Sequence, residues 1–229
     1  MDTLKEDRGC YASPRHRDIL GGLLAHPAIE RAFFLTGGTA LSVFYLHHRV
    51  SDDLDLFTLE PVSLSELDFW IRARWKSSCS KIKEGPDFLS FLIDETKVEF
   101  VRDPLSNNDE RPHAEFDDGR RLKVDNLRNV VSNKLAAMVS RQEPKDFVDF
   151  YFIMMLNPGL DMERTWLDAR RKDAIFDDPP TAAFQLEEGL ALIREKPDLL
   201  PEVRLEFDRK AFLDYFAGIA EWLYRKYQP

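Results

Sequence analysis

Cysteine is scarce in this chain, since its 229 residues contain only Cys10 and Cys79. Two cysteines are too few for a disulfide framework, and neither stands in the clustered Cys/His spacing that is typical of a zinc site. Both side chains are therefore predicted to be free thiols in a reducing compartment.

Long apolar runs are also missing. The longest, Phe150 to Leu156, is far shorter than the roughly 20 residues that a bilayer-spanning helix needs. The segment from Met1 to Leu20 is charged, and it carries Pro14 and Arg15 where a signal peptide would need apolar residues. These absences predict a soluble, cytoplasmic protein with no membrane partner.

Positive charge is in deficit overall, because the net charge is −9. This disfavours indiscriminate binding of nucleic acid over the whole surface. One segment, Ile71 to Lys83, is locally basic and lies beside Trp70 and Trp75, so it could bind RNA through charge and stacking. Such a pattern is more often a solvated amphipathic helix with buried tryptophans. The cations of the segment are Arg72, Arg74, Lys76, Lys81 and Lys83.

The first half of the chain mixes helical and strand patterns. The hydrophobic periodicity and turn signals predict helices over 14–30, 39–48 and 63–76, and strands over 32–36, 53–57, 88–93 and 97–102. The turn Gly37-Gly38 connects the first strand to the second helix.

After a polar stretch, 103–119, only helical patterns follow. They cover 125–141, 144–155, 162–172, 181–195 and 208–227. The fold class predicted is α+β, with residues 1–120 forming a catalytic lobe around a small mixed sheet. Residues 121–229 are predicted to form a helical lobe that closes over the nucleotide site.

Two carboxylates stand out in the predicted strand over 53–57. Side chains in a strand alternate in direction, so Asp53 and Asp55 project from one face, about 7 Å apart along the chain. Carboxylate oxygens together with substrate phosphates are the usual ligands of Mg²⁺. The pair is predicted to bind this metal, although two surface aspartates on a solvated edge strand would show the same spacing.

The glycine turn supplies a second element of a site. Glycines allow backbone amides to approach a ligand closely, and the following helix N-terminus offers unpaired N–H groups to an anion. Gly37, Gly38 and Thr39 are therefore predicted to hold a triphosphate opposite the aspartates. Ser51 could hydrogen-bond either the strand or a phosphate oxygen, and Arg49 could reach a phosphate.

A third carboxylate would complete a site that activates an attacking hydroxyl. Glu99 is the candidate, because the apolar side chains of Val98 and Phe100 leave it on the opposite face of the predicted strand. Asp94 and Asp103 compete for this role, and Glu99 could instead be an exposed strand residue.

These motifs together resemble the abortive-infection toxin-type nucleotidyltransferases, the AbiEii/AbiGii family of the DNA polymerase β-like superfamily. The matching runs are Leu35 to Leu41 (LTGGTAL) and His48 to Phe57 (HRVSDDLDLF), followed by Lys134 to Ala137, Arg141 and Lys145 to Asp149. The family more often has Asp where this chain has Glu99. The last 70 or so residues carry no motif that matches.

The resemblance implies Mg²⁺-dependent transfer of a nucleoside monophosphate from an NTP to an acceptor hydroxyl. It also implies a bacterial toxin neutralised by an antitoxin, with tRNA or other RNA favoured over a protein or small-molecule acceptor. Lys134 would touch the nucleotide phosphates and Asp146 would help to organise the site. Without the resemblance, both would be taken for charged residues on a solvated helix face.

Two rival functions remain open at this stage. One is a non-catalytic module that keeps the fold and binds a nucleotide or a partner protein. The other is a glycosyltransferase, which can use an Asp-x-Asp pair to hold a metal and a nucleotide sugar. The glycosyltransferase reading leaves the glycine turn directly before the acidic strand unexplained.

Overall fold

The structure is a computed structural model that describes residues 3–226 of the chain. It divides the chain into two compact units, Met1–Asn126 and Leu127–Pro229. The predicted boundary, 120/121, lies a few residues earlier because Arg121–Val124 forms strand β8, which belongs to the sheet of the first unit. Each unit is described here by itself.

The first unit is built on a mixed eight-stranded sheet with the order β1-β7-β8-β2-β3-β6-β5-β4. Its strands are β1 (Thr3–Leu4), β2 (Phe33–Thr36), β3 (Leu54–Thr58), β4 (Cys79–Gly85), β5 (Phe88–Ile93), β6 (Thr96–Arg102), β7 (His113–Glu115) and β8. The central strand β3 runs antiparallel to β2 and parallel to β6. The predicted α+β class with a mixed sheet is confirmed.

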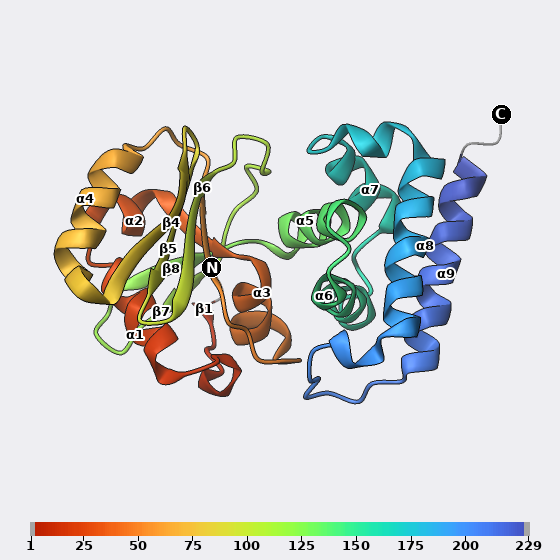
Figure 1. Cartoon of the computed structure of the whole chain (residues 1–229), viewed down its shortest axis with the longest axis horizontal. Coiled ribbons are helices and arrows are strands. Elements are labelled where there is room, and N and C mark those ends of the chain that lie inside the picture. The colour runs from red at the N-terminus through yellow and green to blue at the C-terminus, as the bar shows by residue number, and fades with distance from the viewer. Residues whose placement is uncertain (1–2, 227–229) are drawn as a thin grey trace. The chain divides into compact units, whose positions relative to one another are not determined.

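Helices α1 (Pro14–Leu23), α2 (Pro27–Ala32) and α4 (Leu64–Trp75) gather beside the strands in Figure 1. Leu20, Ile29 and Leu67 from these helices share one hydrophobic core with Leu35 and Leu56 of the sheet. Strand residues alternate in direction, so the neighbours of these core residues project from the other face of the sheet. Polar side chains can therefore stand on that face without disturbing the core.

Several predicted elements are confirmed within a few residues, namely β2, β3, β5, β6 and α4. The single helix predicted over 14–30 is wrong, because Pro27 begins a new helix after α1 has ended at Leu23. The helix predicted over 39–48 begins earlier, as α3 (Gly37–Ala40), and continues as a π-helix, Leu41–Leu46. His47 then adopts a left-handed conformation, with φ 54°, and ends it.

The basic segment does not form a single helical face. Its first part is the end of α4, and its last part is strand β4, so Lys81 and Lys83 lie on the sheet edge. Arg72 and Lys81 both pair with Asp68, at 2.8 and 3.0 Å. The guanidinium of Arg74 lies over the half-buried rings of Trp70 and Trp75.

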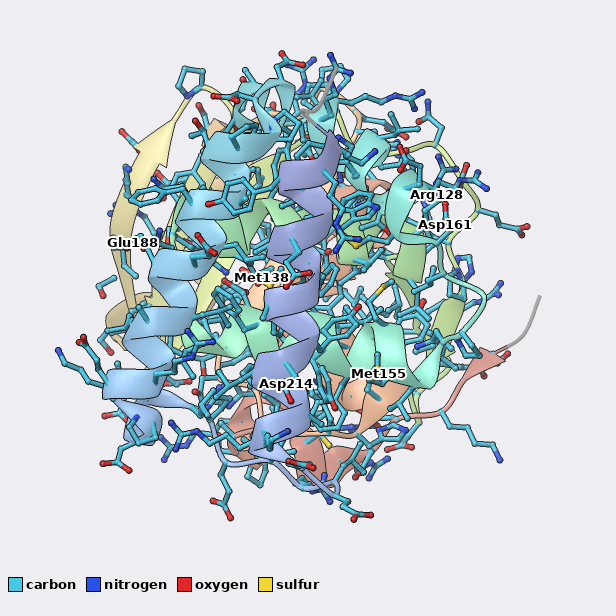
Figure 2. The ribbon with its side chains drawn as sticks, turned by 90° about the vertical axis from the view of Figure 1, so that its right-hand side faces the viewer. Arg128, Met138, Met155, Asp161, Glu188 and Asp214 are labelled. Carbon is cyan, nitrogen blue, oxygen red and sulfur yellow. The ribbon has the colours of Figure 1, made fainter. Side chains whose placement is uncertain are left out.

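The second unit is helical, as predicted. Its helices are α5 (Leu127–Ser140), α6 (Pro144–Leu156), α7 (Met162–Arg170), α8 (Pro179–Glu195) and α9 (Arg209–Lys226). Figure 2 shows α8 and α9 side by side, with Glu188 and Asp214 on their surface. Phe147, Phe150 and Phe216 pack edge to face or tilted in the core of this unit. Tyr227, the last residue of the predicted final helix, lies outside the described residues.

Candidate active site

The predicted carboxylates come together through the pairing of β3 and β6. Asp55 and Glu99 are direct partners in the parallel register of these strands. Asp53 lies one residue before β3, which begins at Leu54 rather than at the predicted residue 53. The side chains of all three are partly exposed, whereas Leu54 and Leu56 are fully buried. The register thus places Asp55 and Glu99 next to each other on the face away from the helices.

The turn at Gly37 lies directly against this carboxylate pair. Gly37 has φ +68°, a left-handed conformation that favours glycine, and a Cβ built at this position would overlap the Asp55 carboxylate. Gly38 is packed just as closely, since a Cβ there would meet Arg49 and Ser51. Neither position has room for a side chain. Both glycines therefore allow the backbone of the turn to approach the Asp55 side chain and the Arg49–Ser51 segment.

Thr39 and Ser51 fix the segment that leads into β3. The hydroxyl of Thr39 lies 3.0 Å from that of Ser51 and donates a hydrogen bond to the backbone carbonyl of Asp53. Both side chains are buried. In this structure the two hydroxyls thus serve to position Asp53, and their predicted contact with phosphate remains a prediction.

His16 was not predicted as part of the site. Its Nε2 lies 2.7 Å from the carbonyl oxygen of Asp52, and its Nδ1 lies 3.0 Å from the Ser13 hydroxyl. The ring, which comes from α1, is almost fully buried and holds the residue just before Asp53. No local sequence signal connects position 16 with position 52, so only the fold could reveal this contact.

Lys97 is the second contributor that sequence reasoning did not assign. Its Nζ lies 2.9 Å from Oε1 of Glu99, and the Ser90 hydroxyl donates to the same oxygen at 3.3 Å. Burial acts to lower the pKa of Lys97, but the bond to Glu99 and the charges of Glu99, Asp53 and Asp55 raise it overall. The i, i+2 spacing of Lys97 and Glu99 on one strand face was the available signal.

The donor set fits a hard divalent cation. Asp53, Asp55 and Glu99 offer only oxygen atoms, which Mg²⁺ prefers, and their combined negative charge is felt by Lys97. Such carboxylates repel one another unless a cation lies near them. The residues present thus suit a bound Mg²⁺ together with the phosphates of a nucleotide.

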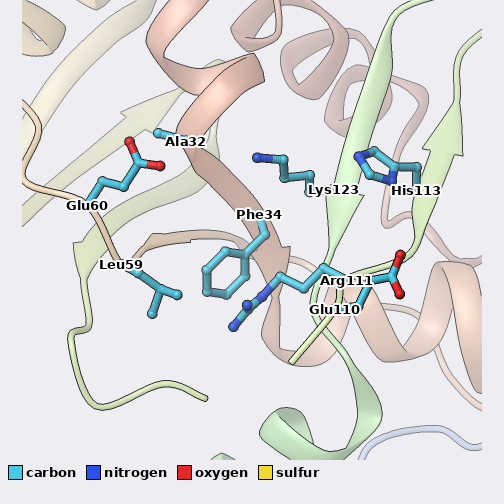
Figure 3. A pocket seen from close by; sticks show the side chains of 8 residues that line it. All are labelled: Ala32, Phe34, Leu59, Glu60, Glu110, Arg111, His113 and Lys123. Carbon is cyan, nitrogen blue, oxygen red and sulfur yellow. The ribbon is translucent and has the colours of Figure 1, made fainter. Parts of the chain in front are cut away.

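A cavity of about 260 Å³ opens on the same unit. Phe34 and Lys123 are partners across β2 and β8, and Lys123 also pairs with His113 of β7. Figure 3 shows these three side chains together with Arg111, whose guanidinium lies 3.8 Å from the centre of the Phe34 ring. Because Phe34 and Thr36 share a strand face and Thr36 is the register partner of Asp55, this cavity lies on the face that carries the carboxylates.

A buried carboxylate connects the cavity with that strand. Asp125 accepts a hydrogen bond from Thr36 at 2.7 Å and pairs with Arg111 at 3.0 Å. Asp125 is fully buried and was predicted only as the first residue of the helix over 125–141. It instead joins the end of β2 to the wall of the cavity.

In the second unit, Lys134 and Asp146 form a buried ion-pair cluster. The ammonium of Lys134 lies 2.8 Å from Asp146 and 2.7 Å from Asp149, and Arg141 pairs with Asp146 at 2.7 Å. Lys134 is only 5% exposed and both aspartates are fully buried. The resemblance implied that Lys134 touches phosphates, and that role remains a prediction. The structure assigns both residues a contact inside their own unit.

The first unit thus has a mixed sheet with flanking helices, and a helical unit follows it in the chain. The chain belongs to the family described as nucleotidyl transferase AbiEii toxin, type IV TA system, whose sequence model matches residues 18–217. The match extends well into the last helices, where no motif had been recognised in the sequence.

Similar proteins come from several sources. A protein of Aquifex aeolicus (strain VF5), uncharacterized protein aq_aa25, is 35% identical over 130 residues, which are 53% of this chain and 57% of the relative. The chain thus spans little more than half the length of that curated relative.

Among solved structures, JHP933 from Helicobacter pylori is 16% identical, with a TM-score of 0.48 over 93% of this chain and 94% of that one. The complex of ANT(2")-Ia with adenylyl-2"-tobramycin is 15% identical, with a TM-score of 0.44 over 71% of this chain and 97% of that one.

Within residues 3–226, which the structure describes, no helix has the length and apolar character that a membrane span requires.

Proposed function

We propose that this protein is a Mg²⁺-dependent nucleotidyltransferase that moves a nucleoside monophosphate from an NTP to an acceptor hydroxyl. One observation carries the proposal: Asp55 and Glu99 are register partners on parallel strands, and the left-handed turn at Gly37 lies against the Asp55 carboxylate. The family, a toxin of a type IV toxin-antitoxin system, supports the same class of reaction.

In this mechanism Asp53 and Asp55 would hold the Mg²⁺, which would neutralise charge on the triphosphate. Gly37, Gly38 and Thr39 receive the phosphates at the start of the helix. The acceptor hydroxyl attacks the α-phosphorus, the bond to the bridging oxygen breaks, and pyrophosphate leaves. Glu99 takes the proton of the hydroxyl. Such transfer depends mostly on positioning and charge neutralisation.

Lys97 has a further role in this proposal. It neutralises part of the charge of Glu99 before a substrate arrives. When the triphosphate is bound, the phosphates compete with Glu99 for the ammonium group, because both carry negative charge. Glu99 is then no longer paired with Lys97 and accepts the proton of the acceptor hydroxyl.

The favoured acceptor is RNA, including tRNA, and the proposed setting is a cytoplasmic toxin held in check by a cognate antitoxin protein. Protein and small-molecule acceptors are the alternatives within the same reaction class. A non-catalytic nucleotide-binding module is the alternative outside it. Arg72 pairs with Asp68 and Arg74 lies over the Trp70 ring, so an RNA acceptor is better tested with the other cations of the basic segment.

The test is to incubate the purified full chain with each α-labelled NTP, Mg²⁺, and either total RNA or a cell extract. We expect label to enter one fraction with one or two of the nucleotides, and EDTA to abolish the labelling. Full transfer in excess EDTA would refute the metal-dependent mechanism. Nucleotide binding without transfer to any fraction would favour the non-catalytic module.

A matched pair of variants connects that activity to the site. Asp55→Asn should lower transfer by about 100-fold or more while the protein stays folded, because a ligand of the metal is lost from a partly exposed face. Asp52→Asn makes the same change at an exposed aspartate three residues earlier and should retain activity. Equal activity of the two variants would show that Asp55 is not a metal ligand.

A further inference from the structure

The fold brings together two side chains from the start of the chain and one from position 47, none of which is a candidate active-site residue. Asp7, Cys10 and His47 each offer one ligand atom, and these atoms all lie within 4.8 Å of one another. Asp7 caps a short 3-10 helix, Cys10 is the last residue of that helix, and His47 ends the π-helix that follows α3. We propose that Asp7, Cys10 and His47 form a zinc site.

The spacing of the ligand atoms is close to that of a tetrahedral zinc ion. Bond lengths of about 2.3 Å to sulfur and about 2.0 to 2.1 Å to nitrogen and oxygen, at the tetrahedral angle, separate ligand atoms by about 3.4 to 3.6 Å. Oδ2 of Asp7 lies 3.5 Å from Sγ of Cys10 and 3.9 Å from Nδ1 of His47. The third pair, Sγ of Cys10 and the ring nitrogen of His47, lies within 4.8 Å, so the His47 ring must turn towards the other two ligand atoms to complete the geometry.

The chemistry of the ligands selects zinc over magnesium. A thiolate and an imidazole favour Zn²⁺, whereas Mg²⁺ prefers oxygen atoms alone, as at Asp53 and Asp55. One thiolate and one carboxylate balance the double positive charge, and the imidazole binds in its neutral form. The Cys10 thiol gives up its proton when the ion binds. Three protein ligands leave the fourth tetrahedral position to water.

The backbone around the cluster is already fixed. The amide of Asp7 donates to the carbonyl of Val43 at 2.9 Å, and the amide of Ser51 donates to the carbonyl of Cys10 at 3.0 Å. The second oxygen of Asp7 accepts from the amide of Gly9 at 2.9 Å, which leaves Oδ2 facing the other two ligands. Little rearrangement of the backbone is needed for an ion to bind.

Burial differs between the ligands in a way that suits metal entry. Cys10 is fully buried, whereas the side chains of Asp7 and His47 are 34% and 41% exposed. An ion can thus arrive from solvent at Asp7 and His47, which are the exposed members of the cluster. Bound zinc would tie the first residues of the chain to the helix that begins at Gly37, and it should stabilise the first unit.

One existing contact competes with the metal. Nδ1 of His47 lies 3.1 Å from the carbonyl oxygen of Ser42, and it donates a hydrogen bond there when it carries the proton. Zinc binding requires the other tautomer, in which the proton is on Nε2. A hydrogen-bonded helix end without metal is the alternative, and it predicts no metal binding at this place.

The test is a Co²⁺ titration of the reduced, chelator-treated full chain, because Co²⁺ replaces zinc and is visible by absorption. We expect the first equivalent of Co²⁺ to give near-ultraviolet thiolate-to-metal charge transfer and the visible bands of tetrahedral coordination, which distinguish it from Co²⁺ at the oxygen ligands of the candidate active site. Zn²⁺ should displace the Co²⁺ and excess Mg²⁺ should not. Absence of the thiolate band in the unmodified protein at stoichiometric Co²⁺ would overturn the proposal.

Matched variants locate the ion. Cys10→Ser should lose the charge-transfer band, whereas Cys79→Ser, at the other thiol of the chain, should keep it. Asp7→Asn, checked for folding by circular dichroism, should weaken Co²⁺ binding by about tenfold or more. If Cys10→Ser does not fold, Asp7→Asn is the variant that decides the test. Retention of the band in Cys10→Ser, or unchanged affinity in Asp7→Asn, would place the ion elsewhere. No nucleotide is needed, so the result is independent of the proposed transferase activity.

Discussion

The two units of this protein use carboxylates in opposite ways. In the first unit, Asp55 and Glu99 stand partly exposed on a sheet face beside a glycine turn. In the second, Asp146 and Asp149 are fully buried and are paired with Lys134 inside the helical core. Buried charges are stable only when they are paired, whereas exposed ones can remain available to a ligand. The comparison favours the proposed chemical role for the first set and a structural role for the second.

The largest effect is expected where the buried cluster of the second unit is broken. Lys134→Met removes the cation shared by Asp146 and Asp149 and should lower the free energy of unfolding by about 3–5 kcal/mol. Lys145→Met, at a partly exposed lysine of α6 whose partner Glu143 is also partly exposed, should change it by about 0.5 kcal/mol or less. Urea unfolding followed by circular dichroism measures both. Similar stability of the two variants would contradict a structural role for Lys134.

The next prediction sharpens the role of the glycine turn in the first unit. Gly37 and Gly119 both have positive φ, but an added Cβ would overlap Asp55 at the first and meet nothing within 4 Å at the second. Ala at either position should cost about 1 kcal/mol in backbone strain. Only Gly37→Ala should also lower transfer activity, by about 100-fold, because Asp55 is displaced. If Gly119→Ala loses as much activity, strain rather than close approach explains the effect.

Acid should reveal the buried cluster through the pKa of Asp146. Burial acts to raise this pKa, but Lys134 and Arg141 lower it below the ordinary value of 3.8. A carboxyl with a lower pKa in the folded state stabilises the fold above its unfolded pKa, and this contribution is lost as the pH falls. The free energy of unfolding should therefore decrease below about pH 4, and less steeply in Asp146→Asn than in Asp214→Asn, where the replaced side chain is exposed. Equal slopes would show that Asp146 does not carry this dependence.

The smallest effect concerns the exposed cations of the first unit. Lys76 and Lys83 are exposed, while Arg72 and Lys81 are paired with Asp68. If RNA is the acceptor and binds here, Lys76→Glu with Lys83→Glu should reduce RNA labelling several-fold at low salt. The double variant should also reduce the slope of log RNA affinity against log salt concentration by about 1 for each lost phosphate contact. Unchanged labelling and slope would move the acceptor site to another surface.

Local sequence patterns predicted much of the fold, because in these segments the period of the apolar residues matches the burial of their side chains. The alternation in β3 and β6 placed Asp55 and Glu99 on one face, and the strand register bears this placement out. Strand β4 was missed since its exposed pattern lacks a buried apolar face, and most of its side chains are charged or small. Pro27 was the local signal that could have divided the first predicted helix.

Contacts between distant positions could not be predicted. His16 reaches the carbonyl of Asp52, and Asp125 reaches Thr36, through the arrangement of whole elements. The proposed zinc ligands illustrate the same limit. The two cysteines lack the clustered Cys/His spacing of familiar zinc motifs, and this excludes only those motifs. His47 ends the π-helix at Leu41–Leu46. Its nearness to Cys10 depends on how the start of the chain returns to that helix end.

The π-helix at Leu41–Leu46 has a consequence for how this segment tolerates changes in length. A π turn contains one residue more than an α turn, so a single-residue deletion there could be absorbed by tightening the turn. His47 and Ser51, which follow it, would then keep their direction relative to Gly37, whereas a deletion from a regular α-helix would rotate them by about 100°. This short segment should thus tolerate the loss of one residue better than the regular helices of the chain do.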